Sequence, residues 1–482
     1  MLFNSIDFLL FLPIVFVLYW FGGKSKKWQN LFLVISSYYF YGYWDWRFTI
    51  LIFLTSIFSF ASGLLISKYE KEKLKRNFFA SVNIILNLSI LAVFKYFNFF
   101  TENIVLFLNK IGFYIDNFTV SIILPVGISF YTFQALSYTI DVYNHKIEST
   151  KDFVGFLAYI CFFPQLVAGP IERATNLLPQ FQGKRFFNYR DAVDGMRQML
   201  WGFFKKIVIA DNCAFIVNTY WDNYQHLNGL TLLVIGILFS LQIYSDFSGY
   251  SDIAIGCAKL FGIKLKRNFN YPYFSKSIPE FWRRWHISLM TWFRDYLYIP
   301  LGGSRCGKWK TIKNVFIVWA LSGLWHGANW TFVAWGLFHA IILSIYISLN
   351  INTKVNQYDV EKPIWSYIKN GIQILVTFFL TTIGWIIFRS NNISEAFSFI
   401  TRMFTTYSFE NNLECGKGIY YLFIGFVMLA TEWVQRDKNH ALQLNEKHLF
   451  KYQPMRWSIY IFIVLTIVFF QGNSQTFLYF QF

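Results

Sequence analysis

The stretch IVIADNCAFIVNTYWDNYQHLNGLTLLVIGILFSLQIYSDFSGYSDIAIGCA, residues 207–258, contains no lysine and no arginine. Two apolar runs flank its central polar segment, NTYWDNYQHLNG, and the longer one, residues 230–258, is long enough to cross a hydrocarbon core of about 30 Å. Basic residues return on both sides, at Lys205 and Lys206 before it and in KLFGIKLKRNF after it. Because basic loops stay on the cytoplasmic side, we expect two crossings joined by an external loop.

The whole chain has the composition of a membrane protein. Of its 482 residues, 55% are hydrophobic and 22% aromatic, but only 14% are charged, against about 25% in soluble domains. The net charge of +17 would suggest nucleic-acid binding in a soluble protein, but lysine and arginine cluster here in short loops between apolar runs. That distribution is typical of cytoplasmic loops and argues against a nucleic-acid partner.

The five cysteines are scattered along the chain and form no CxxC motif, so the sequence predicts neither a disulfide framework nor a metal site. We interpret them as small apolar packing residues. No HExxH, GxSxG or GxGxxG motif occurs either.

Loop charge predicts about twelve crossings in one all-α integral membrane domain that covers residues 1–482. The first helix, before Lys24, lacks the basic residues of a signal peptide and is expected to remain uncleaved. Basic residues flank both ends of residues 153–168 and 281–300, so these runs are expected to be re-entrant helices. The other predicted spans are residues 29–45, 47–66, 78–98, 119–141, 365–388, 417–434 and 457–470, and the final FLYFQF is expected outside.

The segment FWRRWHISLMTWFRDYLYIP, residues 281–300, mixes ionisable and apolar side chains. Its ionisable residues are Arg283, Arg284, His286, Arg294 and Asp295. On a continuous helix Arg284 and Asp295 would share one face and His286 would lie on another. Four unpaired charges facing lipid would cost on the order of 10 kcal/mol, so the segment must lie at the interface or face protein. An interfacial helix whose arginines reach lipid phosphates is the alternative, and it leaves Asp295 and His286 unexplained.

His326 lies in LSGLWHGANW, residues 321–330, which interrupts a long apolar region. Gly323 and Gly327 allow a helix break or a close approach of backbones, so we place His326 near mid-membrane at a break between two helices. Burial keeps an imidazole neutral and able to accept a proton. The alternative is a core histidine that bonds to a carbonyl group.

Three further stretches offer polar groups near membrane segments. QIYSDFSGYSDIAIG provides Asp246 and Tyr250, and FFPQLVAGPIER provides Glu172. For each, the alternative is a structural hydrogen bond or ion pair. GGSRCGK, residues 302–308, fits GxxxxGK, but Trp309 replaces the required Ser or Thr and no strand precedes it, so we reject a nucleotide-binding loop. Its basic residues, Arg305 and Lys308, remain candidates for phosphate binding.

Five of these stretches together resemble the membrane-bound O-acyltransferase superfamily, and within it the bacterial branch typified by the alginate O-acetyltransferase membrane subunit. They occur in the family's order from about residue 120 to 340: LPVGISFYTFQALSYTIDVY, FFPQLVAGPIER, YSDFSGYSDIAIG, NFNYPYFSKSIPEFWRRWHISLMTWFRDYLYIPLGGSR and LSGLWHGANWTFVAWG. The resemblance implies a multi-helix bundle that encloses a tunnel. It makes His326 the counterpart of the family's hallmark histidine and His286 that of its second catalytic-site histidine.

The resemblance implies acetyl transfer from a cytoplasmic thioester such as acetyl-coenzyme A, a donor substrate rather than a bound cofactor, to an exported polysaccharide. Alginate, another exopolysaccharide and peptidoglycan are candidate acceptors, and an extracytoplasmic acetyltransferase partner would complete the transfer at the bacterial inner membrane. Such chemistry needs a base for the hydroxyl proton, which suits His326, and a donor for the oxyanion, a role for His286 or a group near it. D-alanyl transfer to teichoic acid is an alternative, and a transporter or lipid-binding scaffold is another.

Overall fold

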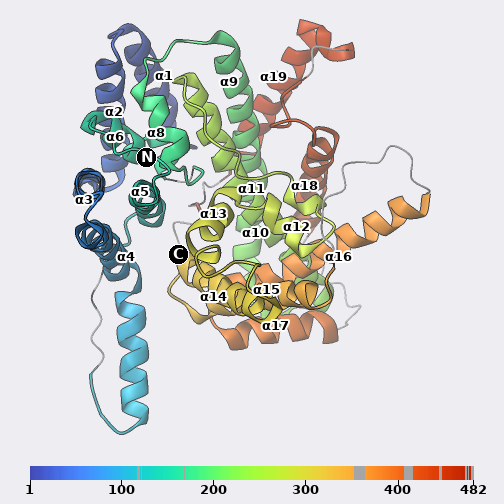
Figure 1. The fold of residues 1–482 in the computed structure, drawn as a ribbon. Coiled ribbons are helices and arrows are strands. Elements are labelled where there is room, and N and C mark those ends of the chain that lie inside the picture. Colours follow the sequence, from blue (N-terminus) through green and yellow to red (C-terminus); the bar gives the residue numbers. More distant parts are fainter. Residues whose placement is uncertain are drawn as a thin grey trace. The chain divides into compact units, whose positions relative to one another are not determined.

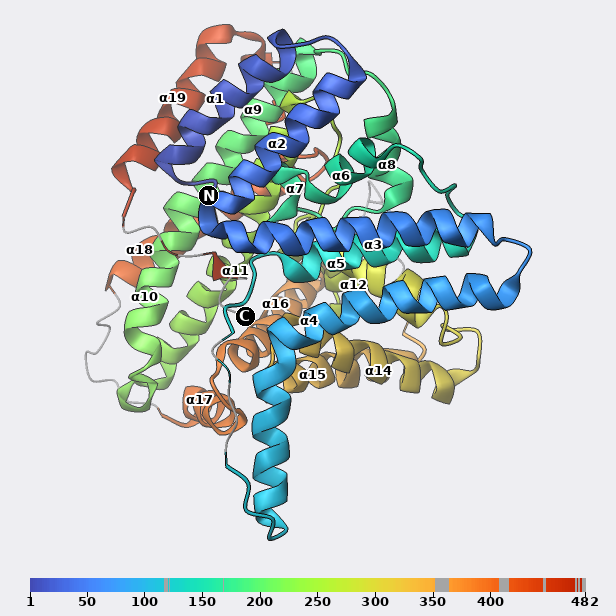
Figure 2. The same cartoon turned by 90° about the vertical axis from the view of Figure 1, so that its left-hand side faces the viewer.

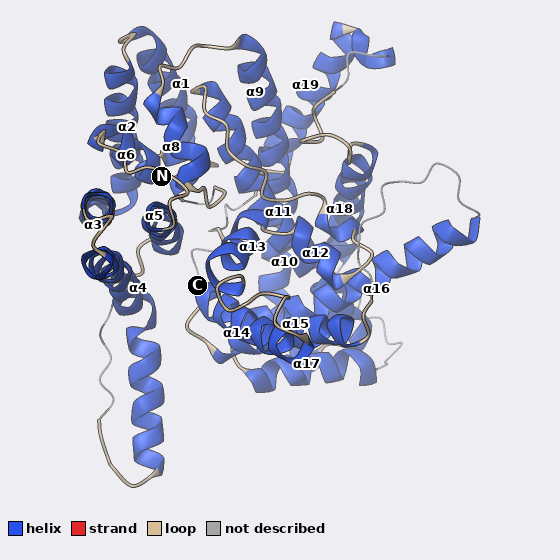
Figure 3. Cartoon of the chain, in the orientation of Figure 1, coloured by secondary structure: helices blue, strands red, loops and turns tan. Residues whose placement is uncertain are grey.

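The computed structural model describes residues 1–116, 120, 122–167, 169–351, 364–406, 416–444, 448–472, 475 and 477–478. Within these ranges the regular structure is entirely helical, without a strand (Figures 1 and 3). The chain forms two compact units, one of residues 1–196 with 254–266 and the other of residues 197–253 with 267–482. Two long helices, α9 (Tyr189–Phe203) and α11 (Gly229–Leu260), contribute residues to both units.

Six helical stretches among the described residues are long and apolar enough to cross a membrane, which confirms the class expected from the composition. They are Lys26–Lys68, Lys73–Lys110, Gly229–Leu260, Trp330–Ser348, Trp365–Arg389 and Gly416–Val434. Two shorter apolar helices, Ile6–Phe21 and Gln453–Phe469, add to them. The expectation of about twelve crossings with re-entrant helices stays a prediction.

The first unit is built on the amino-terminal helices. They are α1 (Ile6–Phe21), α2 (Lys26–Asp45), η1 (Trp46–Phe48), α3 (Thr49–Lys68), α4 (Lys73–Lys110), α5 (Ile128–Tyr143), α6 (Phe153–Cys161), α7 (Phe163–Leu166) and α8 (Ala174–Gln182). Helices α3, α4 and α5 run side by side (Figure 2). Buried polar side chains join them, since Asn83 Nδ2 on α4 donates to Thr139 Oγ1 on α5 at 2.6 Å. Apolar faces alone do not drive helices together in lipid, so such bonds help to specify the packing.

The second unit carries most of the predicted site residues. Its elements after α9 are η2 (Phe204–Ala210), α10 (Asp211–Trp221), η3 (Tyr224–His226), η4 (Pro272–Phe274), α12 (Ile278–Arg284), α13 (Ile287–Phe293), η5 (Arg294–Tyr298), α14 (Lys308–His326), α15 (Trp330–Ser348), α16 (Ile364–Arg389), α17 (Ile393–Thr405), α18 (Gly416–Val434), η6 (His448–Lys451) and α19 (Gln453–Phe469). Residues 204–210 and 294–298 are π-helical, a local widening that is frequent at functional sites.

Several predicted boundaries need correction. The segment 281–300 is not one continuous helix, because the chain breaks between α12 and α13 at Trp285 and His286. Arg284 and Asp295 therefore do not lie on one helix face. Helix α5 begins only at Ile128, nine residues after the predicted start at residue 119, which itself lies outside the described residues. Helix α4 instead continues to Lys110, beyond the predicted end at residue 98.

Candidate active site

His326 is the last residue of α14 and begins the turn that leads into α15. Its side chain is buried, with 5% of the residue exposed. The imidazole meets the rings of Trp335 and Phe388 edge to face, at centroid distances of 5.1 and 5.3 Å. The predicted helix break at this histidine is confirmed, and it is the turn of a hairpin formed by α14 and α15. Its depth in a membrane stays a prediction.

Glycines allow the two helices of this hairpin to approach closely. A Cβ atom on Gly323 would collide with the backbone carbonyl of Phe332, and one on Gly336 would collide with that of Trp319. Both contacts would be closer than real Cβ atoms allow, so larger residues at these positions would push the helices apart. The glycines therefore fix the position of His326 at the end of the hairpin.

His286 lies at the break between α12 and α13, in the left-handed region with φ 43° and ψ 51°. It is 1% exposed. The ring of Phe247 on α11 packs edge to face against its imidazole at 4.6 Å, and Trp325 on α14 lies 6.0 Å away. This segment is outside the six candidate spans, and burial lowers the pKa of His286 to about 3, which keeps the ring neutral at physiological pH.

Trp325 connects the two histidines. Its ring lies 6.0 Å from the His286 ring and 4.9 Å from the ring of His326, its neighbour in sequence. The structure therefore gathers the two residues that the sequence singled out, from separate elements, around one indole. His339, to which the sequence assigned no role, belongs to the same aromatic cluster, and its Nδ1 accepts a bond from Trp282 Nε1 at 3.3 Å.

The basic residues among the candidates from the sequence are mostly on the surface. Arg283, Arg294, Arg305 and Lys308 are exposed. Arg294 pairs with its neighbour Asp295 at 2.6 Å. Arg284 is more enclosed and pairs with Glu280 one turn earlier, at 2.8 Å. Of the predicted basic residues, the four exposed ones are thus placed to meet a ligand from solvent.

Asp246 and Tyr250 lie on α11 beside a buried lysine that loop charge had placed on the cytoplasmic side. Lys206 Nζ lies 2.8 Å from Asp246 Oδ1 and 2.8 Å from Asp211 Oδ1, and it is 5.5 Å from the Tyr250 ring centroid. Lys206 is only 1% exposed. The expectation that Lys206 lies in an exposed loop is wrong, because its side chain is buried in the second unit and its charge is neutralised there by Asp211 and Asp246.

The end of the described chain reaches the same place. The backbone N–H of Leu478 donates to Asp246 Oδ2 at 2.8 Å, and Lys206 donates to the carbonyl of Gln475 at 3.2 Å. The Phe477 ring packs on Tyr250 at a centroid distance of 4.3 Å. Phe477 and Leu478 are buried, so these residues of the predicted external FLYFQF tail lie in the core of the second unit.

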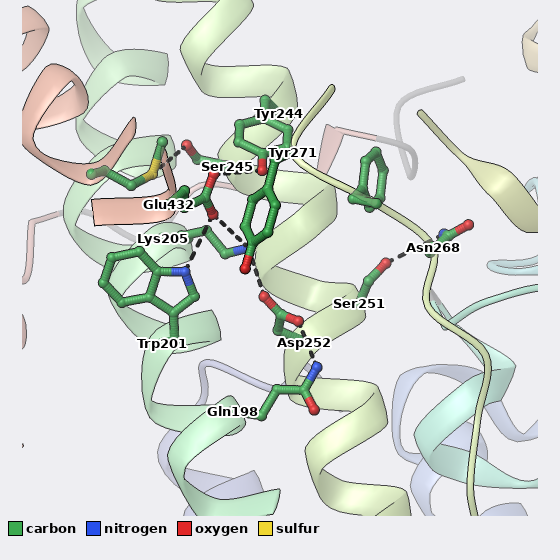
Figure 4. Close-up of polar contacts among 12 residues, drawn as sticks. Gln198, Trp201, Lys205, Tyr244, Ser245, Ser251, Asp252, Asn268, Tyr271 and Glu432 are labelled. Carbon is green, nitrogen blue, oxygen red and sulfur yellow. Dashed lines mark hydrogen bonds and ion pairs between the residues drawn. The ribbon is translucent and has the colours of Figure 1, made fainter. Parts of the chain in front are cut away.

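Lys205 forms a second buried charge network (Figure 4). Its Nζ lies 2.6 Å from Asp252 on α11 and 3.7 Å from Glu432 on α18. Gln198 donates to Asp252 at 2.7 Å, and Tyr244 donates to Glu432 at 2.7 Å. Sequence reasoning missed this network, although a lysine and an aspartate inside apolar segments are themselves a signal of buried pairing.

Glu172 lies in the first unit and is fully buried. Its carboxylate accepts the backbone N–H of Lys266 at 2.5 Å and the Asn176 side-chain amide at 2.7 Å. Burial raises the pKa of this carboxyl above its usual value. Among the described residues, no group of three or more His, Cys, Asp or Glu side chains could hold a metal ion.

Fold and site together define an all-helical membrane protein with two buried histidines in an aromatic cluster. The family model for the membrane-bound O-acyltransferase family matches residues 38–386, and the chain belongs to this family. It is therefore an acyltransferase. The chain is similar to the probable alginate O-acetylase AlgI of Pseudomonas aeruginosa, with 38% identity over 92% of this chain and 83% of that protein.

Two other relatives differ in the acceptors that they are named for. The peptidoglycan O-acetyltransferase of Helicobacter pylori is 34% identical over 84% of this chain and 80% of its own length. The teichoic acid D-alanyltransferase of Bacillus subtilis is 31% identical over only 55% of this chain and 68% of its own length. The similarity to the alanyltransferase is thus the more partial of the two.

Proposed function

We propose that this acyltransferase moves acetyl from a cytoplasmic thioester to a hydroxyl group of an exported or cell-wall polysaccharide. The donor would be acetyl-coenzyme A or another acyl thioester, and the protein would lie in the bacterial inner membrane. The observation that carries the proposal is the burial of His286 and His326 around the single ring of Trp325. The relatives named as O-acetylating enzymes cover most of the chain, which supports acetyl as the transferred group.

His326 is the base in this proposal. The acceptor hydroxyl gives its proton to the imidazole while its oxygen attacks the thioester carbonyl carbon. A carbon–oxygen bond forms, the carbonyl oxygen becomes an oxyanion, and the carbon–sulfur bond then breaks. The imidazolium returns the proton to the leaving thiolate, so the products are an ester and a thiol.

The basic residues near the breaks of the second unit would receive the donor. Coenzyme A carries several phosphate charges, and the exposed side chains of Arg305 and Lys308 flank the amino-terminal end of α14. Arg283 and Arg294 offer further exposed guanidinium groups on the segment that holds His286. An extracytoplasmic acetyltransferase partner would complete delivery to the polysaccharide.

Acetyl turnover by the purified protein tests this function. Protein in detergent, given radiolabelled acetyl-coenzyme A, should release coenzyme A thiol and pass acetyl to water or to a polysaccharide fragment. His326→Gln should lower this rate by about 10²–10⁴-fold, the usual contribution of a general base. His226→Gln, at an exposed histidine of the same unit, is the matched control and should leave the rate unchanged.

Each other outcome contradicts a stated part of the proposal. Equal turnover by wild type and His326→Gln would remove the base role from this histidine. Turnover of a D-alanyl carrier-protein thioester in place of acetyl-coenzyme A would replace acetyl as the transferred group. If envelope glycans from cells with and without the protein carry equal amounts of ester-linked acetate, polysaccharide is not the acceptor.

A further inference from the structure

Asn268 holds one side of the His286 ring. Its Oδ1 lies 3.2 Å from His286 Nδ1, 2.9 Å from Ser288 Oγ and 3.2 Å from the backbone nitrogen of Ser288. Asn268 is fully buried. On its other side, its Nδ2 donates to Ser251 Oγ on α11 at 3.4 Å, and Figure 4 shows this bond.

These contacts favour one tautomer of His286, although Ser288 Oγ also lies 3.5 Å from Nδ1. A backbone N–H is always a donor, so the Asn268 atom that faces the Ser288 nitrogen must be the amide oxygen. An amide oxygen only accepts hydrogen bonds, so the His286 nitrogen that faces it must carry the proton. The neutral ring is therefore protonated on Nδ1, and its lone pair lies on Nε2.

Backbone bonds join the two partners into one piece. The N–H of Ile287 donates to the Asn268 carbonyl at 2.9 Å, and the N–H of Asn270 donates to the Arg284 carbonyl at 2.8 Å. Residues 268–270 therefore run alongside the break that carries His286. Because Ser251 ties Asn268 to α11, the amide has little freedom to rotate away from the ring.

We infer that Asn268 is a positioning residue that fixes His286 in the Nδ1–H tautomer, so that His286 presents an acceptor nitrogen, Nε2, to the substrate. The inference rests on the proposed function for the role of His286 in acyl transfer. A neutral His286 then accepts a hydrogen bond from the acceptor hydroxyl, or from the coenzyme A thiol once the carbon–sulfur bond has broken, and does not donate one to the oxyanion. The expectation that His286 itself supplies the oxyanion donor is replaced by this role.

The surroundings of the ring agree with a neutral acceptor. The rings of Phe247 and Phe269 face the imidazole at 4.6 and 6.4 Å, and Trp325 lies at 6.0 Å. The other groups that contact the Asn268 side chain are the hydroxyls of Ser251 and Ser288 and the backbone N–H of Ser288, and all of them are uncharged. Burial lowers the pKa of His286 to about 3, so protonation does not interrupt its acceptor role near neutral pH.

Nitrogen NMR on protein labelled with ¹⁵N-histidine tests the tautomer without any turnover. The His286 signals are identified by their loss in His286→Asn. In wild type Nδ1 should show the shift of a protonated nitrogen and Nε2 that of an unprotonated one, and Asn268→Leu should move the proton to Nε2. Asn270→Ala, which changes the neighbouring asparagine, should leave the signals in place. A wild-type ring protonated on Nε2 would overturn the inference.

The pH dependence of acetyl turnover tests the functional consequence. Asn268→Asp keeps an acceptor oxygen but puts a negative charge beside Nδ1, which favours the imidazolium and raises the pKa of His286. This variant should approach the wild-type rate at high pH and lose about tenfold in rate per pH unit below the raised pKa of His286, a loss additional to the one that protonation of the base His326 causes in wild type. Asn268→Leu should be at least tenfold slower at every pH.

The outcomes separate this inference from the proposed function. A pH profile of Asn268→Asp that parallels wild type would show that the state of His286 does not matter for transfer, even if His326→Gln is inactive. Conversely, a protein that turns over no acetyl would refute the proposed function, while the NMR shifts would still decide the tautomer. Thermal melting of each variant in detergent shows whether a lost rate reflects unfolding.

Discussion

Lys206→Met should destabilise the protein strongly, because this lysine is the shared cation of two buried carboxylates. Its Nζ lies 2.8 Å from both Asp211 and Asp246, and the three side chains are 1%, 6% and 4% exposed. Removing one partner of a buried ion pair costs about 3–5 kcal/mol, since the remaining charge stays desolvated. Here two carboxylates would lose their cation, so we expect the upper part of that range.

The companion variants identify charge as the cause. In Lys206→Met combined with Asp211→Asn and Asp246→Asn the cluster is neutral, and most of the lost stability should return. Lys259→Met is the control, because its ion pair with Asp194 is also short, at 2.6 Å, but the side chains are 17% and 28% exposed. Water screens such a pair, so its loss should cost about 1 kcal/mol or less.

The measurement is the free energy of unfolding in mixed micelles, followed by tryptophan fluorescence during denaturant titration. Lys206→Met should unfold several kcal/mol more easily than Lys259→Met. Equal losses in these two single variants would refute the reasoning, because the buried carboxylates would then not depend on Lys206. If the triple variant stays as unstable as Lys206→Met, the loss comes from packing and not from charge.

The other predictions concern single residues. Gly336→Leu should lower the free energy of unfolding by about 1–3 kcal/mol or more, because the new Cβ would collide with a backbone carbonyl. Gly371→Leu, at a glycine that faces open space, should be nearly neutral, and thermal melting compares the two variants. Burial raises the pKa of Glu172, so the folded state favours its protonated form. The free energy of unfolding should therefore fall as pH rises from 4.5 through the raised pKa. Glu172→Gln should remove this pH dependence, and an unchanged dependence would contradict the assignment. Arg294→Ala should change the free energy of unfolding by less than about 1 kcal/mol, because the arginine side chain is 59% exposed. If the guanidinium contacts donor phosphates, the same variant should raise the KM for acetyl-coenzyme A.

Long apolar runs were predictable because their ends are marked by polar residues. The predicted spans 365–388 and 417–434 agree closely with α16 and α18. The start of α5 was not found, although the sequence carries its signal. Gly127 adopts φ 74° directly before the helix, and Pro125 precedes it, a combination that delays helix formation.

The candidate site was predictable only where a motif marked it. His326 stood out because glycines surround it in an apolar run. Lys205 and Lys206 were misassigned because counting loop charge treats every lysine as solvent-exposed, and most of their partner carboxylates lie far away in the sequence. Asn268 opens one of the five quoted stretches, but nothing in that stretch distinguishes it from its neighbours, since its role depends on a contact with His286 that only the folded chain creates.

The left-handed backbone of His286 restricts which amino acids a mutant library can return at this position. At φ 43° a β-branched residue is strained, whereas glycine, asparagine and histidine tolerate the conformation. Selection for folded protein alone should therefore enrich this small set before activity is considered. An alanine here changes the backbone preference together with the imidazole, so asparagine is the replacement that isolates the chemistry of the ring.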